Sequence, residues 1–260
     1  MSPSHTAPFT KRSAHVSTHF FPTEAAGLKW LEAARGARVA KVIEVGKDHL
    51  SIEKITSASP TGGKASAFGE ALHRTHNAGA AYFGSKPPEA PGETGFIGPT
   101  GDALPMPYGE WNQWGTYFAE ARIAPYVTML EHHGLTAHQR DIFERLILRL
   151  RSGDFDDTHR PARLHGDLWS GNLLWSQNDV VLIDPAACGG HPLDDLAMLA
   201  LFSAPYIDNI FAQYAKSAQL EAGWQQRLPL HQIYPLLVHG VLFGASYVQQ
   251  AVRIAQRFAG

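Results

Sequence analysis

Residues 164–175 read LHGDLWSGNLLW, and residues 180–185, VVLIDP, follow after a short polar segment. Asp167 and Asn172 are five positions apart, and Asp184 lies twelve positions beyond Asn172, at the end of an apolar run. Two short apolar segments, 173–175 and 180–183, flank the polar residues 176–179, which is the pattern of a β-hairpin. The sequence therefore predicts that a hairpin brings Asn172 and Asp184 close together in space.

These residue types fit the transfer of a phosphoryl group to a hydroxyl. The transition state spreads charge over the phosphoryl oxygens, so a protein contributes mainly positioning and electrostatic stabilisation. One carboxylate must accept or orient the proton of the acceptor hydroxyl, and Asp167 fits that role. Magnesium prefers hard oxygen ligands, which Asn172 and Asp184 can supply. Asp and Asn are also common turn formers, so a purely structural role stays open for any one of them and is weaker for all three together.

The spacing resembles the catalytic loop H-x-D-x-x-x-x-N of eukaryotic-type kinases, which precedes a strand ending in a metal-binding Asp. Gly166 stands where Arg is usual, and Asp184 is followed by Pro185 and Ala186 instead of Phe and Gly. Both differences favour a small-molecule kinase over a protein kinase.

The composition is that of an ordinary globular protein, with 260 residues, 44% hydrophobic and 18% charged. A formal net charge of −2 gives no broad positive field for nucleic acid or an anionic membrane. The single cysteine, Cys188, excludes an internal disulfide and suits a reducing compartment. No apolar run has the length of a membrane span, and residues 1–5 do not resemble a secretory signal. We therefore expect a cytoplasmic protein without nucleic-acid or membrane partners.

Hydrophobic periodicity predicts a strand-rich N-terminal segment and a mainly helical remainder. Strands are expected over 8–12, 39–45 and 49–55, with a helix from an N-cap at Thr23 to Ala34. Residues 57–63, rich in Ser, Pro and Gly, are the expected hinge between an N-terminal lobe (1–58) and a catalytic lobe (59–260). Three further helical regions are expected: one ending near residue 79, one after a capping box at 136–139, and one from residue 195 to the C-terminus. Residues 84–109 are expected to form a long loop.

Longer stretches resemble the fructosamine kinase (ketosamine-3-kinase) family. The resemblance runs from about residue 9 to residue 247 and is most specific in HGDLWSGN at 165–172, with support from 183–186, 190–191 and 194–198. Two further family patterns are W-x-x-W-x-x-F/Y…R and the ending L-x-N-H-x-x-x-F-G-x-x-Y, matched here by Trp111, Trp114, Phe118 and Arg122 and by residues 236–247. Val238 departs from the second pattern, because the family usually has Asn there.

The resemblance implies an α+β, two-lobed protein-kinase-like fold, with a β-rich N-lobe and a mainly helical C-lobe. It also implies that ATP and Mg²⁺ are used to phosphorylate the sugar 3-hydroxyl of ketoamines formed by glycation, small or protein-bound. That phosphorylation destabilises the adduct and frees the amine, which amounts to repair by deglycation.

The resemblance also implies a role for particular residues. Those roles are a catalytic base (Asp167), magnesium ligands (Asn172, Asp184), a lysine on the α/β-phosphates with its paired glutamate (Lys11, Glu24), a residue at the adenine-binding hinge (Glu53), a brace for the catalytic loop (Asp195) and a sugar pocket (Trp169, His239). Plainer readings stay open for four of them. Lys11 could be a solvated strand residue, and Glu24 could complement a helix dipole. Trp169 could be an ordinary core aromatic residue, and His239 could be a core histidine.

The N-terminus departs from the kinase pattern. Only ten residues precede Lys11, and they contain no glycine, which is too little for the Gly-rich hairpin that covers the ATP phosphates. We expect a shortened N-lobe, unless the sequence begins late. Two alternatives therefore stay open: another small-molecule kinase of the aminoglycoside or choline type, and a nucleotide-binding pseudokinase. Whether the chain is a monomer or a homodimer is also open.

Overall fold

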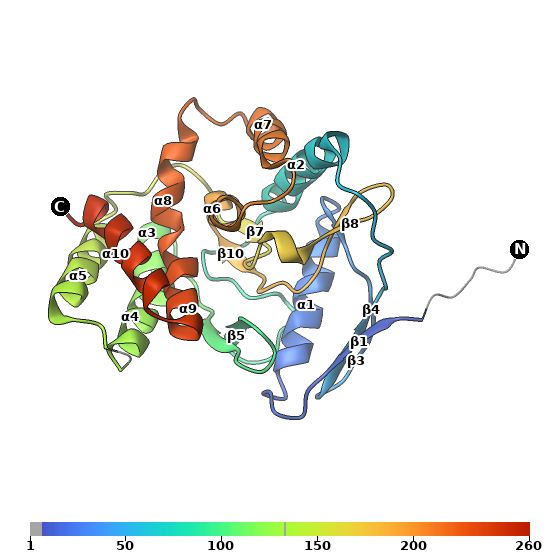
Figure 1. The fold of residues 1–260 in the computed structure, drawn as a ribbon, viewed down its shortest axis with the longest axis horizontal. Coiled ribbons are helices and arrows are strands. Elements are labelled where there is room, and N and C mark those ends of the chain that lie inside the picture. Colours follow the sequence, from blue (N-terminus) through green and yellow to red (C-terminus); the bar gives the residue numbers. More distant parts are fainter. Residues whose placement is uncertain (1–6, 133) are drawn as a thin grey trace, which may run out of the picture.

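The computed structural model describes residues 7–132 and 134–260. A small β-rich lobe near the N-terminus adjoins a larger, mainly helical lobe that holds the C-terminus (Figure 1). The predicted two-lobed α+β arrangement is confirmed. The lobe boundary near residue 58 stays a prediction, and the segment tested above for a secretory signal lies outside the described residues.

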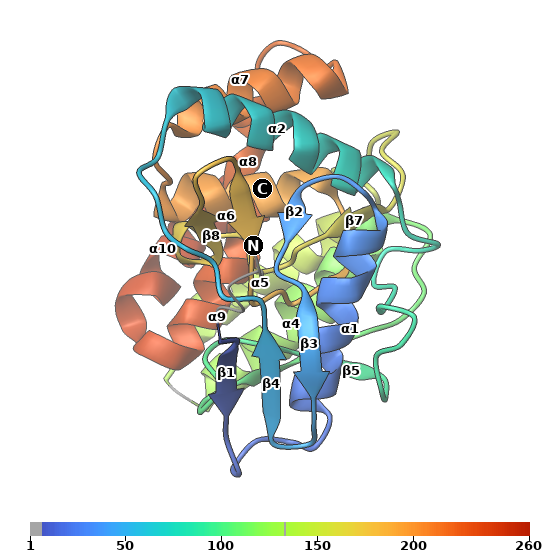
Figure 2. The same ribbon diagram turned by 90° about the vertical axis from the view of Figure 1, so that its right-hand side faces the viewer.

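The N-terminal lobe is a three-stranded antiparallel sheet with one helix beside it (Figure 2). Its strands are β1 (Phe9–Arg12), β4 (His49–Ile52) and β3 (Val42–Val45), in the order β1-β4-β3. Helix α1 (Phe20–Ala33) packs against β3 and β4 and buries Phe21, Leu28 and Leu31. The predicted first strand is confirmed, with Lys11 opposite Leu50 in the register.

Two local predictions in this lobe are wrong. Helix α1 starts at Phe20, so Thr23 lies inside it and is buried, not an N-cap. Burial of Phe20 and Phe21 favours the earlier start, and Pro22 is tolerated because the first turn has no intrahelical acceptors for its amides. The expected strand 39–45 is two strands, because β2 (Arg38–Val39) pairs in parallel with a strand of the other lobe while β3 pairs with β4.

The segment that carries Asp167, Asn172 and Asp184 folds as the spacing predicts. Strand β7 (Ala162–Leu164) leads into the loop, a single 3₁₀ turn η2 (Ser170–Asn172) follows, and β8 (Leu173–Trp175) pairs with β9 (Val180–Leu182) in an antiparallel hairpin. Strand β2 pairs with β9 on its other side, and β10 (Cys188–Gly190) pairs with β7. The sheet β2-β9-β8 thus ties the N-terminal lobe to the catalytic hairpin.

Helices supply most of the second lobe. Helix α2 (Gly62–Asn77) begins at the N-cap Thr61, inside the expected hinge, and the predicted capping box at Thr136 starts α5 (Ala137–Arg151). The expected loop 84–109 is wrong in part, because β5 (Thr94–Ile97) and β6 (Leu104–Pro107) form a hairpin there. The remaining elements are α3 (Trp114–Tyr117), η1 (Phe118–Ile123, a π-helical turn), α4 (Ala124–Glu131), α6 (Pro192–Phe202), α7 (Ile207–Ala218), η3 (Trp224–Arg227), α8 (Leu228–His231), α9 (Ile233–Phe243) and α10 (Ala245–Ala259).

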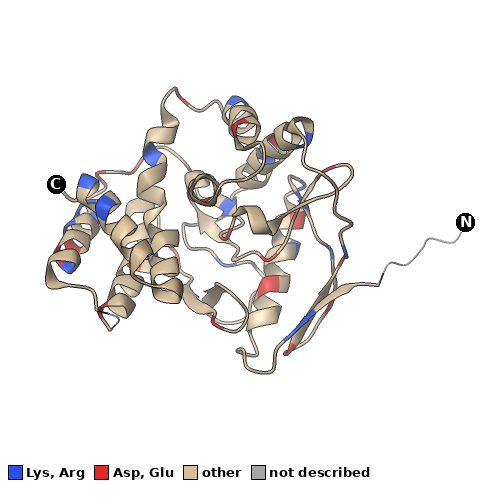
Figure 3. Ribbon diagram, in the orientation of Figure 1, with Lys and Arg blue, Asp and Glu red and all other residues tan. Residues whose placement is uncertain are grey.

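Two hydrophobic clusters stabilise the fold. One lies within the helical lobe, among α5, α9 and α10. The other runs from Leu50 of β4 through Val181 of β9 to Leu196 of α6, so the small sheet shares its core with the catalytic hairpin. Basic and acidic residues are interspersed along the ribbon (Figure 3), as the near-zero net charge suggested. Among the described residues, none of the helices combines the length and the apolar character needed to cross a bilayer.

Candidate active site

Lys11 joins the N-terminal sheet to the catalytic hairpin. Its Nζ donates to Glu24 Oε1 at 2.6 Å and to Asp184 Oδ1 at 2.7 Å. Burial alone would lower the pKa of Lys11, but the two carboxylates outweigh it and raise that pKa. The predicted pairing of Lys11 with Glu24 is therefore present in the geometry, and both side chains are largely buried, with 14% and 9% exposed.

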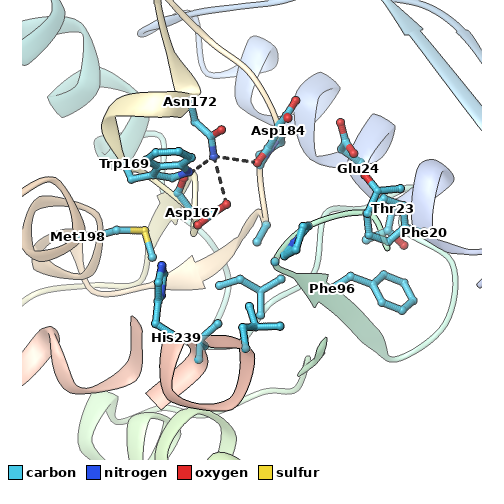
Figure 4. Close-up of a pocket in the computed structure, with 18 of the residues that line it drawn as sticks. Phe20, Thr23, Glu24, Phe96, Asp167, Trp169, Asn172, Asp184, Met198 and His239 are labelled. Atoms are coloured by element: carbon cyan, nitrogen blue, oxygen red, sulfur yellow. Dashed lines mark hydrogen bonds between the residues drawn. The ribbon is translucent and has the colours of Figure 1, made fainter. Parts of the chain in front are cut away.

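Asn172 links the side chain of Asp167 to the backbone of Asp184 (Figure 4). Its Nδ2 donates to the backbone oxygen of Asp167 at 2.8 Å, to Asp167 Oδ2 at 3.1 Å and to the backbone oxygen of Asp184 at 3.4 Å. The hairpin thus brings Asn172 and Asp184 together as expected. Because the amide nitrogen faces Asp167, Oδ1 of Asn172 is directed to other partners.

The backbone on either side of these residues is unusual. Asp184 has φ 54, in the left-handed region, which aspartate and asparagine adopt more readily than other residues with side chains. Single residues in this conformation are concentrated at functional sites, where the surrounding structure enforces it. Gly166 has φ 81, and a Cβ there would lie 2.0 Å from the backbone oxygen of Ala186. This close approach favours glycine at a position where eukaryotic-type kinases usually carry arginine.

Asp195 holds the catalytic loop from behind. It accepts from the backbone N–H of His165 at 2.8 Å and of Gly166 at 2.9 Å. The ring of His76 lies between Asp195 and Tyr214, with Nε2 3.0 Å from Asp195 Oδ2 and Nδ1 2.7 Å from the Tyr214 hydroxyl. Burial opposes ionisation of Asp195, but these donors and neighbouring charges outweigh it and lower its pKa. An ionised carboxylate with three hydrogen-bond partners is a rigid support for the loop.

The environment of Asp167 suits a proton acceptor. Burial raises its pKa to about 7; the hydrogen bond from Asn172 opposes this shift, and the charges of Asp184 and Asp195 add to it. A base is most effective when its pKa lies near the working pH, so Asp167 can both accept and release a proton under ordinary conditions.

A cavity of about 270 Å³ opens in front of Asp167. Lys11, Glu24, Asn172 and Asp184 line its catalytic end. Trp169 lies beside Asp167 and Asn172, and His239 lies on the far side of the cavity (Figure 4). Trp169 is 42% exposed at the cavity mouth. His239, on α9, donates from Nδ1 to the backbone oxygen of Pro235 at 2.8 Å, which leaves Nε2 as its remaining polar atom.

Of the residues predicted to contact nucleotide, metal or sugar, Glu53 alone does not line this cavity. It follows β4, and its carboxylate forms an ion pair with Arg38, which also contacts Asp179 in the β8–β9 turn. Neither Glu53 nor its neighbours in the hinge belong to the described residues that line the cavity. Its place at an adenine-binding hinge therefore stays a prediction.

Sequence reasoning missed one wall of the cavity. The β5–β6 hairpin contributes Phe96, Gly98 and Thr100, and α6 and α9 contribute apolar side chains. The turn-forming residues 98–102 (GPTGD) between two apolar segments were an available signal. The remaining wall residues could not be found from local patterns, because Met198, Val238, Leu242 and Phe243 read as ordinary helix residues.

The polar groups fit a magnesium ion. Asp184 Oδ1 is engaged by Lys11, which leaves Oδ2, and Asn172 has Oδ1. Two hard oxygens on one edge of the cavity match how magnesium is usually held, by one or two side chains together with substrate phosphates.

Comparisons with known proteins also indicate a kinase. The family model described as fructosamine kinase matches residues 2–259. A protein of Lactiplantibacillus plantarum named "Probable ketoamine kinase" is 31% identical over 256 residues, covering 96% of this chain and 86% of that protein.

Solved structures give a similar result. One from Thermobifida fusca, described as "putative fructosamine-3-kinase", superposes with a TM-score of 0.87 at 39% identity, covering 98% of this chain and 86% of the other. The gentamicin complex of APH(2")-IIa has a TM-score of 0.63 at 14% identity, covering 98% and 88%, and shows that the fold is shared with aminoglycoside phosphotransferases.

Proposed function

Because this chain belongs to the fructosamine kinase family, we propose that it transfers the γ-phosphoryl group of ATP to a sugar hydroxyl of a ketoamine. The observation that carries the proposal is the arrangement of Asp167, Asn172 and Asp184 in a cavity that Trp169 and His239 also line. We further propose that the hydroxyl is the 3-hydroxyl and that the product loses its amine, which makes the reaction a deglycation.

In this mechanism Asp167 accepts the proton of the attacking hydroxyl. Its carboxylate lies in the cavity, and the hydrogen bond from Asn172 fixes one of its oxygens. Asp195 accepts from the amides of His165 and Gly166, so the backbone that carries the base is held as well as its side chain. Positioning of this kind accounts for much of the catalysis of phosphoryl transfer.

Lys11 supplies positive charge at the opposite side of the reacting centre. Glu24 and Asp184 orient its ammonium group, and we propose that it meets the α/β-phosphates of ATP. Asn172 and Asp184 would hold magnesium, which when bound neutralises phosphate charge that builds up during transfer. Glu53 is proposed to lie near the adenine, on the hinge side.

The acceptor end of the cavity favours a sugar over a polycation. Trp169 offers an aromatic face and His239 one free ring nitrogen, while the surrounding wall is apolar. Among the described residues that line the cavity, the acidic ones are Glu24, Asp167 and Asp184, all at the catalytic end. A polycationic acceptor such as an aminoglycoside would be better matched by carboxylates on the acceptor wall.

A cytoplasmic location remains a prediction from the single cysteine.

The test is ADP release by the purified protein with Mg·ATP and a panel of acceptors. Fructoselysine or ribuloselysine is expected to stimulate ADP release, whereas an aminoglycoside and choline are not. Phosphorus and proton NMR of the product then identify the hydroxyl, and free amine appearing with time reports deglycation. Nucleotide binding without stimulation by any ketoamine would contradict the proposal, and transfer to choline or an aminoglycoside alone would replace it with the other kinase class.

A further inference from the structure

Helix α1 lies directly on the segment that follows Asp184. A Cβ added to Gly27 would lie 3.0 Å from Cβ of Ala187 and 3.3 Å from Cγ of Pro185, which is tighter than ordinary contact. Glu24 is one turn before Gly27 on the same helix and pairs with Lys11. The position of α1 therefore decides whether Glu24 can reach Lys11.

A second contact holds α1 at its C-terminal end. Arg163 on β7 donates from Nη1 to the backbone oxygen of Trp30 at 2.7 Å, and its guanidinium carbon lies 4.8 Å from the centroid of the Trp30 ring. Nε of Arg163 also donates to the backbone oxygen of Gly79, just beyond the end of α2, at 3.3 Å. Figure 2 shows β7 beside this end of α1.

The partner of Arg163 on α1 is a carbonyl in the last turn of the helix, where the amide four residues later bonds elsewhere. The amide of Ala34, four residues after Trp30, donates to Leu31 at 3.1 Å. The last carbonyls of a helix lack intrahelical donors, and the helix dipole makes that end negative. A guanidinium both satisfies the Trp30 carbonyl and carries the favourable charge, and its stacking on the indole adds a cation–π contact.

We propose that Arg163 is a positioning residue that clamps α1 so that Glu24 stays against Lys11. Arg163 is two residues before His165, on the strand that enters the catalytic loop. The clamp therefore fixes the position of α1, which carries Glu24, relative to the loop that carries Asp167. Without it, α1 moves away, Lys11 keeps only Asp184, and its ammonium is misplaced. This inference rests on the proposed function, in which Lys11 meets the nucleotide phosphates.

Arg163→Met tests the clamp, and Arg149→Met is a matched control. The guanidinium of Arg149 also lies 4.8 Å from an aromatic centroid, that of Phe155, and donates to a backbone oxygen, that of Phe258, at 2.8 Å. It makes these contacts at the far end of the helical lobe. For Arg163→Met we expect the Kd for Mg·AMP-PNP and the KM for Mg·ATP to rise about tenfold, the effect of one lost hydrogen bond to a charged group. The KM for the acceptor is expected to stay unchanged, and Arg163→Lys to restore part of the loss.

Hydrogen exchange gives a readout that needs neither substrate. The amides of residues 20–33 are expected to exchange faster in Arg163→Met than in the wild type, with no such change in Arg149→Met. Gly27→Ala provides an independent displacement of α1 that favours the helix itself. It is expected to weaken nucleotide binding while the melting temperature changes little.

The proposal is overturned if Arg163→Met leaves both the exchange of α1 and the nucleotide Kd at wild-type values. It is also overturned if Arg149→Met produces the same losses, since the effect would then be general destabilisation. If no ketoamine is phosphorylated but nucleotide binding weakens in Arg163→Met alone, the clamp stands and the acceptor assignment falls. If the wild type binds no nucleotide, the proposed function falls and hydrogen exchange alone decides the clamp.

Discussion

Burial of the Asp167 carboxylate lowers the stability of the metal-free protein when that group is ionised. Its side chain is partly buried behind Trp169, beside Asn172, and burial raises its pKa to about 7. A group whose folded pKa exceeds its unfolded value binds protons more tightly when folded. The stability that this provides is present at low pH and is lost as the pH rises through the folded pKa. The charged form of Asp167 is therefore unfavourable for folding and available for catalysis.

Replacing Asp167 with Asn is expected to abolish transfer and to stabilise the metal-free chain. The two proteins are expected to be almost equally stable at pH 4, with the variant gaining as the pH rises to about 7 and constant above it. A shift from 3.8 to about 7 corresponds to about 4 kcal/mol at most. Urea denaturation with EDTA between pH 4 and pH 8 measures the difference. The exposed Asp102→Asn serves as control, and equal stability of wild type and D167N at pH 8 would refute the explanation.

Gly166 is expected to be intolerant of any side chain. Gly166→Ala would place Cβ 2.0 Å from a backbone oxygen at φ 81, so we expect a loss of about 3 kcal/mol or more in the free energy of unfolding. Gly223→Ala separates the two causes, because Gly223 has a similar φ of 84 but its nearest neighbour is a flexible side chain at 3.5 Å. It is expected to lose only about 1 kcal/mol. Similar losses for the two variants would contradict the steric argument.

The β5–β6 hairpin is the element that the sequence pattern concealed. Its strands are only four residues each, and prolines at 105 and 107 weaken the strand signal in β6. Contact with α1 stabilises the hairpin, where the rings of Phe96 and Phe20 lie 5.5 Å apart. The hairpin therefore depends on partners distant in sequence, although it forms part of the cavity wall.

Shortening this hairpin is expected to affect the acceptor alone. Ile97 and Leu104 are the last paired residues of the two strands. Replacing residues 98–103 with Asn-Gly would connect them by a favoured two-residue turn. Removing Gly98 and Thr100 from the wall is expected to raise the acceptor KM about tenfold, with the KM for Mg·ATP unchanged. Steady-state kinetics in both substrates check this. An equal rise in both KM values would mean that the hairpin supports the whole cleft instead of the acceptor wall.

On the scale of the whole molecule, the site depends on two lobes that share one core. Leu50 of the small sheet packs in the same cluster as Leu196 of the helical lobe, and β2 completes the sheet of the catalytic hairpin. Lys11 and Asp184 come from opposite sides of this junction. A ligand that contacts both should therefore stabilise the molecule as a unit.

Magnesium and nucleotide are expected to stabilise the protein together. With Mg·AMP-PNP at a hundred times its Kd, the free energy of unfolding is expected to rise by about 2.7 kcal/mol. Either component alone is expected to give much less, since Asp184 and Lys11 would each meet only half of their partners. Thermal denaturation measures this, and Asp184→Asn is expected to remove the gain. A full shift with nucleotide in EDTA would exclude a role for the metal in binding.

The fold of residues 164–185 could be predicted from the sequence alone. Asn172 and Asp184 flank the β8–β9 hairpin, where spacing and alternation dictate neighbours, Asp167 precedes it by a few residues, and the capping box at Thr136 is likewise a local feature. The contact between Lys11 and Glu24 was expected from resemblance to a family, not from spacing, because the pair spans separate elements, and their role at the nucleotide stays a prediction.

Other features follow only from contacts between distant parts of the chain. These are the early start of α1, the parallel pairing of β2 with β9, the hairpin inside the expected loop and the clamp of Arg163 on Trp30. Each depends on burial or hydrogen bonding between segments far apart in the chain. Local patterns cannot register such partners, because the free energy that selects them comes from surfaces that meet only when the whole chain has folded.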